Sequence, residues 1–342
     1  RGQPLDLVQN YKYLGVVISN DGSWDAAIER NKAQATRAYH SVLKILRNPN
    51  LSIHSRLKVW KSLVRPVLEY GMEIWNPFKK FLQRLESFQN RALRTVVGGS
   101  PHVATPAVLG DLGVPPVSAR LRRYKVRMAA KLGGMSEDRL TKQVWLHHHY
   151  RVRNNRRRAF RVVWRLEQQH ISRRGGPRIP SGGAAHEDAW SNWLRDTKQW
   201  MKSDIELDWR AQRDAKRSLV FYRLVKDRFR REGYTDLAPA KYGRLVFQAR
   251  SNSLPLAKAV AKTGRGTPFC KACSTNSEED LRHFLLECPA LEDERRELRR
   301  AMDSVSVNRS QGSSPSQGDL ESQWALDMLQ ALNEKCCAEE LW

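Results

Sequence analysis

The sequence has 342 residues, of which 40% are hydrophobic, enough to build the cores of two or three small domains. Lys and Arg number 60 against 36 Asp and Glu, and the net charge of +24 attracts polyanions and opposes self-association. No apolar run approaches the roughly 18 residues that cross a bilayer, so nucleic acid is favoured over a membrane as the partner.

The cysteine content and the N-terminal residues bear on the compartment and the processing of the chain. Five cysteines are too few, and odd in number, for a disulfide framework, which favours a reducing intracellular compartment, either nucleus or cytoplasm. The chain opens at Arg1 rather than Met and has no apolar leader, so we interpret it as a fragment or a processed product.

Residues 1–100 predict a strand or hairpin followed by three packed helices. The β-rich run 11–18 precedes a turn signal at 20–22. A first helix should stop at residues 48–50, and Ser52 should cap a second helix that Pro66 kinks or ends. The third helix should end at Gly98 and turn these apolar residues inward: Leu82, Leu85, Ala92, Leu93 and Val96.

Residues 101–185 predict a Pro/Gly connector (to about residue 120) and then a basic helical region. The densest cationic stretch interleaves arginines with aromatic residues, which suits phosphate contacts and base stacking. Its arginines are Arg151, Arg153, Arg156, Arg157, Arg158, Arg161 and Arg165. We interpret Trp164 as a core residue, and residues 156–158 could also serve as a nuclear-localisation signal. Residues 173–185 are rich in Gly and Pro and predict a mobile linker.

The remaining ranges are 186–265, 266–295 and 296–342. The first is helical, with Trp190, Trp193, Leu194 and Trp200 on one apolar stripe and a further helix near residues 242–261. The second holds a cysteine–histidine cluster. The third predicts a Ser-rich linker and a C-terminal helix, so the expected fold is mainly α throughout.

Cys270, Cys273, His283 and Cys288 supply three thiolates and one imidazole, the ligands of a closed tetrahedral zinc site. A short helix over 281–287 should present His283 and end before Cys288, because the residue ahead of Pro289 is pushed out of helical geometry. A chance pairing of an ordinary Cys-x-x-Cys with a buried His and Cys is the alternative. Four protein ligands leave no open position, which disfavours catalytic zinc.

Four segments resemble the reverse transcriptases of non-LTR (LINE-type) retrotransposons, in the family's order. Tyr13–Val16 resembles the motif that follows the polymerase palm, and Leu63–Gly71 and Leu85–Arg94 resemble two thumb helices. Cys270–Cys288 resembles the family's C-terminal CCHC zinc knuckle. The resemblance implies a helical thumb-like subdomain, a basic helical middle region and a small knuckle, with element RNA and target DNA as partners.

Polymerisation by two metal ions needs clustered aspartates, and the sequence contains no Asp-Asp pair. In the family this motif lies upstream of the Tyr-Leu-Gly segment. We therefore expect a polymerase fragment without a catalytic site of its own, acting as the downstream, nucleic-acid-binding half. Two rivals stay open: completion by a palm, on an upstream polymerase portion or another chain, and a repurposed zinc-binding adaptor that binds protein.

The resemblance to a thumb also implies which cations contact a primer–template. These are Arg30, Lys32, Arg37 and Lys44 on the first helix and Arg91 and Arg94 on the third. A solvated, charged helix face would carry the same residues, so position alone does not separate the two interpretations.

Overall fold

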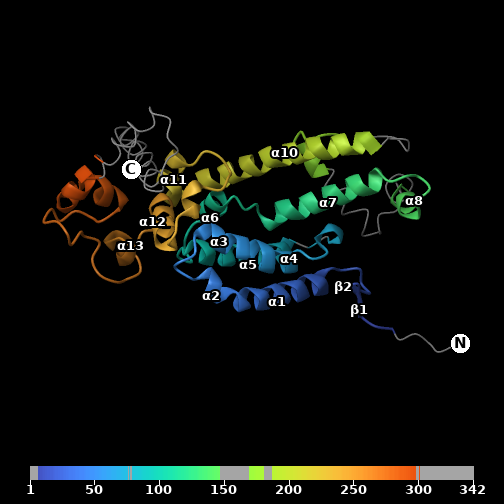
Figure 1. The fold of residues 1–342 in the computed structure, drawn as a ribbon, viewed down its shortest axis with the longest axis horizontal. Helices are drawn as coiled ribbons and strands as arrows, with labels where there is room; N and C mark the ends of the chain where they lie inside the picture. The colour runs from blue at the N-terminus through green and yellow to red at the C-terminus, as the bar shows by residue number, and fades with distance from the viewer. Residues whose placement is uncertain are drawn as a thin grey trace. The chain divides into compact units, whose positions relative to one another are not determined.

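The computed structural model describes residues 7–75, 77, 79–146, 169–180, 187–297 and 300. Within them the chain is mainly α-helical and forms one two-stranded antiparallel sheet (Figure 1), so the predicted fold class is confirmed. Among the same residues, no helix combines the length and the apolar character that crossing a membrane would require.

The strands are β1 (Asn10–Tyr13) and β2 (Val16–Ser19). The α-helices of the first half are α1 (Asp25–Ser41), α2 (Leu43–Leu46), α3 (Ile53–Val59), α4 (Arg65–Leu68), α5 (Lys79–Val97), α6 (Thr105–Leu112), α7 (Val117–Gly133) and α8 (Leu140–Leu146). Those of the second half are α10 (Glu187–Asp214), α11 (Val220–Val225), α12 (Ala240–Arg250) and α13 (Ala257–Ala261). Short π or 3-10 turns are η1 (Trp60–Val64), η2 (Met72–Ile74), η4 (Arg217–Leu219), η5 (Gly233–Asp236), η6 (His283–Glu287) and η7 (Pro289–Leu291).

The β-rich run folds as a hairpin whose turn lies inside it, at Leu14 and Gly15. Both residues have positive φ angles (45° and 82°), which the tight hairpin turns that match strand twist require. The Tyr70 hydroxyl donates to the carbonyl oxygen of Leu14, and the Arg30 guanidinium donates to that of Gly15, each at 2.7 Å. These bonds hold a leucine in a backbone conformation that it rarely adopts.

The second predicted helix changes its hydrogen bonding ahead of Pro66. Ser52 caps α3 as predicted, because its side chain accepts from the backbone N–H of Ser55. The α-helix then gives way to the π-helical turn η1 before α4 begins at Arg65. Proline cannot donate to the carbonyl one turn earlier, and the π turn absorbs that break without ending the helix.

The chain divides into two compact units, each drawn from three separate stretches. The first contains Arg1–Val42, Lys61–Gln89 and Pro115–Asp208, and the second contains Leu43–Trp60, Asn90–Val114 and Trp209–Trp342. The sequence does not show that segments far apart along the chain group in this way. The division into the ranges 1–100, 101–185, 186–265, 266–295 and 296–342 stays a prediction.

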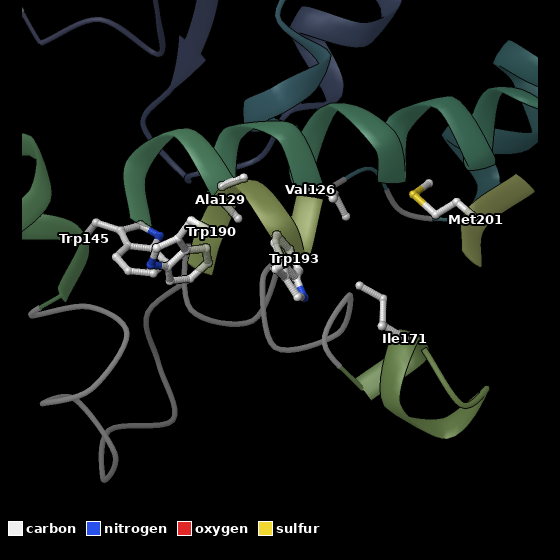
Figure 2. Packing of buried hydrophobic residues seen from close by; sticks show 8 residues of the cluster. Val126, Ala129, Trp145, Ile171, Trp190, Trp193 and Met201 are labelled. Carbon is white, nitrogen blue, oxygen red and sulfur yellow. The ribbon is translucent and has the colours of Figure 1, made fainter. Parts of the chain in front are cut away.

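The first unit has a tryptophan-rich core between α7, α8 and the start of α10 (Figure 2). Trp190 packs edge-on against Trp145 and Trp193, with ring centroids 5.3 and 5.6 Å apart. Trp190 and Trp193 are buried, and Leu194 and Trp200 pack against the same cluster, so the predicted stripe is confirmed.

Four local expectations need correction. The Pro/Gly connector contains α6, where Pro106 occupies a first-turn position that proline favours. The described part of the linker (173–180) packs against α10, since the Trp193 and Trp200 indoles donate to its backbone carbonyls. The single helix near 242–261 is two helices, α12 and α13. On the third helix Leu82 is half-buried, while Phe81 and Phe88 are buried.

The core of the second unit encloses a charged network around Asp111 on α6. The carboxylate accepts hydrogen bonds from the hydroxyls of Tyr222 (2.8 Å) and Tyr234 (2.6 Å). Arg250 donates to both carboxylate oxygens, at 3.2 and 3.4 Å. Asp111 is fully buried, so these partners replace the water that a carboxylate would otherwise need.

Candidate metal centre and cationic residues

Cys270 and Cys273 lie in a narrow loop closed by backbone hydrogen bonds. Phe269 pairs with Glu278 in an isolated antiparallel bridge, and the backbone N–H of Cys270 donates to the Ser277 carbonyl at 2.9 Å. The loop therefore turns the two cysteines toward one side with little chain between them. A pair of thiolates two residues apart can then share one ion.

His283 begins the π-helical turn η6, and Cys288 follows directly after it. The Asp280 carboxylate accepts from the backbone N–H of His283 at 3.0 Å and so satisfies a helix-start donor. Cys288 is extended, with φ −63° and ψ 116°, as Pro289 predicts. The helix thus ends where it must for the last thiol to reach the other ligands.

The four donor atoms form one cluster. The two thiol sulfurs of Cys270 and Cys288 are 3.9 Å apart, and the Cys273 sulfur is 3.4 Å from His283 Nε2. All four lie within 4.8 Å of one another. Zinc–sulfur bonds of about 2.3 Å and zinc–nitrogen bonds of about 2.0 Å place tetrahedral ligands roughly 3.5–3.8 Å apart. The donors fit such an ion, and the sulfur–sulfur separation exceeds the roughly 2.05 Å of a disulfide.

The thiols of this cluster differ in acidity. Hydrogen bonds from the side chain and backbone of Thr275 lower the pKa of Cys273 to about 6. Desolvation raises the pKa of the Cys288 thiol, which is fully buried. The Cys288 carbonyl in turn accepts from the Arg295 guanidinium at 2.6 Å, which fixes the backbone behind this ligand.

The cluster is attached to the helices of its own unit, the second, by apolar contacts that sequence reasoning missed. Leu281 is 2% exposed and packs with Phe221 on α11 and Ala249 on α12. Leu285 and Leu286 join the same contact. The leucines are visible in the sequence next to His283, but their partners are 30 or more positions away, and no local pattern links them.

The thumb-like cations have different surroundings. Arg30 donates to the Gly15 carbonyl, and Arg94 donates to the Val103 carbonyl at 2.9–3.0 Å, so both guanidinium groups hold backbone. Lys32 lies 3.6 Å from the Glu29 carboxylate. The side chains of Arg37, Lys44 and Arg91 are exposed.

Several predicted residues lie outside the described part of the chain. These are Arg151, Arg153, Arg156, Arg157, Arg158, Arg161, Arg165 and Trp164, together with residues 181–185 of the predicted linker, residues 298–299 and the whole of 301–342. The arginine-rich stretch and the C-terminal linker and helix stay predictions.

Comparison with known proteins gives one consistent class of relatives. The chain is 27% identical over 127 residues to the RNA-directed DNA polymerase from mobile element jockey of Drosophila melanogaster, covering 36% of this chain and 14% of that protein. It is 24% identical over 136 residues to the probable RNA-directed DNA polymerase from transposon BS of the same species, covering 38% and 15%. For the probable polymerase from transposon X-element of that species, the figures are 24% over 132 residues, 38% and 14%.

No family model and no solved structure matches the chain. The matched segment spans about a seventh of the length of each of these relatives. The resemblance to non-LTR retrotransposon reverse transcriptases is confirmed over somewhat more than a third of the chain.

Proposed function

We propose that this chain is a nucleic-acid-binding part of a non-LTR retrotransposon reverse transcriptase and binds element RNA and target DNA. The observation that carries the proposal is the net charge of +24 on a chain related to RNA-directed DNA polymerases. An excess of this size favours polyanions through release of their counterions. Because the sequence contains no Asp-Asp pair, we assign it no polymerisation chemistry of its own.

We further propose that Cys270, Cys273, His283 and Cys288 hold one structural zinc ion. The spacing of their donor atoms and the mixed sulfur–nitrogen set support this assignment. A zinc ion bound by four protein ligands crosslinks the loop to η6 and has no free position for substrate. The role of the residues is then to fix this small module against α11 and α12.

Salt titration of binding tests the nucleic-acid proposal. The purified chain should bind single-stranded RNA and duplex DNA tightly at low salt. The logarithm of the association constant should fall linearly with the logarithm of salt, by about 0.7–0.9 per phosphate contact. Binding of protein but not of RNA or DNA, unchanged by salt, would favour the adaptor interpretation instead.

Metal analysis tests the zinc proposal. One zinc per chain is expected, and Cys273→Ser should abolish stoichiometric binding because three ligands hold the ion far less tightly. The matched control replaces both Cys336 and Cys337 with Ser, which leaves the four ligands in place. Freshly purified protein without zinc, or loss of zinc in the control, would show that the ligand assignment is wrong.

A further inference from the structure

The cations of α7 fall into two sets with different surroundings. Arg120 donates to the Glu69 carboxylate, and Arg122 lies 3.3 Å from the Asp204 carboxylate. Both carboxylates are buried and belong to other elements of the first unit. These arginines are therefore neutralised within the fold, and they attach α7 to its neighbours.

The second set is Arg123, Arg127 and Lys131. All three are exposed, and they have no ion-pair or hydrogen-bond partner among the residues that the structure describes. The helix itself contains no acidic residue that could neutralise them. Their three positive charges therefore face solvent and form no ion pair within the described part of the chain.

These three residues form a row. They are spaced four residues apart, so each step advances about 6 Å along the helix and turns by only about 40°. Ala129 lies on the opposite side of α7 from the row and Val126 lies to one side of it, and both pack in the tryptophan-rich core (Figure 2). The row is therefore held on a rigid support. Its spacing is comparable to the separation of neighbouring phosphates along an extended strand.

A hollow lies beside the row within the same unit. Its volume is about 820 Å³, and its lining includes Arg127, Lys131 and Arg139, with Tyr124 from α7. Two carboxylates, Glu73 and Glu187, also line it. Arg123 adds a further cation beyond the hollow, so positive charge exceeds negative along this surface.

We propose that Arg123, Arg127 and Lys131 bind consecutive phosphates of a nucleic-acid strand that runs along α7 and past Arg139. This inference rests on the proposed function and adds a defined contact surface to it. Arginine makes bidentate contacts with phosphate, and lysine contributes a point charge. Phosphate contacts of this kind set the position of a strand without reading its sequence.

The test compares two triple variants of the full chain. Arg123→Gln, Arg127→Gln and Lys131→Gln remove the row. Lys79→Gln, Lys80→Gln and Lys202→Gln remove the same charge from exposed positions that form no row. Salt titration uses a single-stranded RNA and a duplex DNA of equal length. Circular dichroism checks that both variants keep the helicity of the wild type, since every substituted side chain is exposed.

For the row variant, the log–log salt slope should flatten by about 2 to 3, and affinity at 0.1 M salt should fall on the order of 100-fold. The control slope should change by less than about 1. Should the row variant lose helicity, Arg127→Gln alone should still flatten the slope by about 0.7–0.9.

An effect confined to RNA or to DNA would support the row and identify its strand. If the wild type binds nucleic acid but the row variant has the same salt slope as its control, the contact surface is wrong and the proposed function still stands. If the wild type shows no salt-dependent binding, the proposed function itself fails.

Discussion

Asp111 shows how one residue can organise the core of the second unit. Its carboxylate is fully buried, and the charge of Arg250 balances it. Burial opposes the charged form of Arg250, but the nearby carboxylate more than offsets this and raises the pKa of the guanidinium. A buried pair of this kind contributes little net stability, yet removal of one charge leaves the other without compensation.

We therefore expect Asp111→Asn to lower the free energy of unfolding by about 3–5 kcal/mol, because Arg250 would stay buried with only the Glu232 carboxylate, at 3.6 Å, to balance its charge. Chemical denaturation followed by circular dichroism measures this loss. Asp227→Asn is the control, since that carboxylate is 81% exposed and should change stability by less than about 0.5 kcal/mol. A similar small effect at Asp111 would contradict the importance of the network.

Alkaline pH should weaken the same network through its tyrosines. Burial, together with Asp111, raises the pKa of both Tyr222 and Tyr234 well above the ordinary value. Their neutral forms therefore stabilise the fold fully below about pH 10, where unfolded tyrosine ionises, and this stabilisation is lost as pH rises further. Each tyrosine should lower the free energy of unfolding by up to about 1.4 kcal/mol per pH unit above that point.

Tyr234→Phe removes one of these groups and should make the alkaline decline shallower by about that amount. Lys226, whose pKa burial lowers, acts in the opposite direction, but it is present in both proteins and does not alter the comparison. Denaturation curves at several pH values from 9 to 11 measure the difference. Parallel declines in the two proteins would mean that Tyr234 ionises as easily in the fold as in the unfolded chain.

At the residue scale, sequence reasoning succeeded where the cause was local. Ser52 caps a helix that starts directly after it, and Pro289 forces the residue before it to be extended. Asp111 could not be predicted in the same way. Its tyrosine and arginine partners lie 111 to 139 positions further along the chain, and only the tertiary fold brings them together.

The contact between α7 and α10 depends on Gly133. A Cβ atom at this position would lie 2.3 Å from a ring atom of Trp190, far inside van der Waals contact. Gly133→Ala should therefore lower the free energy of unfolding by about 1–3 kcal/mol, despite the higher helix propensity of alanine. Denaturation followed by tryptophan fluorescence measures this.

Gly233→Ala is the matched control, because a Cβ atom there would meet nothing within 4 Å. It should be close to neutral. A Gly133→Ala protein as stable as the wild type would show that Trp190 can move aside without cost.

Removal of the metal should unfold the cysteine–histidine module and leave the helices of the first unit folded. The module over residues 268–290 has few apolar side chains, so we expect metal binding to supply its folding energy, on the order of 10 kcal/mol for such sites. The structure adds that Leu281 packs against Phe221 and Ala249. Chelation should therefore unfold 268–290 and also loosen the contact face of α11 and α12.

Hydrogen exchange followed by mass spectrometry distinguishes these regions. Amide protection should fall in 268–290, and partially around residues 221 and 249, while the amides of α1 stay protected because its core is separate. Zinc added back should restore protection. Full protection in the chelated protein would mean that apolar contacts alone hold the module.

Sequence patterns located elements better than they located boundaries and connections. Helical periodicity identified α1, α5, α7 and α10, whose apolar stripes are long. It missed α6, because a helix buried on nearly every side has no polar face to give the pattern a period. It also merged α12 and α13, since the residues between them include apolar leucines that continue the pattern.

On the scale of the whole molecule, the fold divides its positive charge between two uses. Part of it is neutralised inside, as at Arg250 with Asp111 and Arg120 with Glu69. Another part, which includes the Arg123, Arg127 and Lys131 row, is exposed to solvent. The net charge of +24 follows from the sequence alone. Which cations are neutralised and which are exposed became known only when the structure placed their carboxylate partners.

The arginine cluster Arg156, Arg157, Arg158 and Arg161 allows a general charge effect to be separated from local contact. If a diffuse field governs binding, replacing any four of the 60 cations should weaken binding alike. If these arginines touch phosphates, changing all four to Gln should flatten the log–log salt slope by about two to four, because the slope counts displaced counterions. Replacing Lys79, Lys80, Lys202 and Lys216 with Gln removes the same charge and should change the slope far less. Equal slopes in the two variants would show that the cluster is a solvated surface and that the chain holds nucleic acid through its overall field.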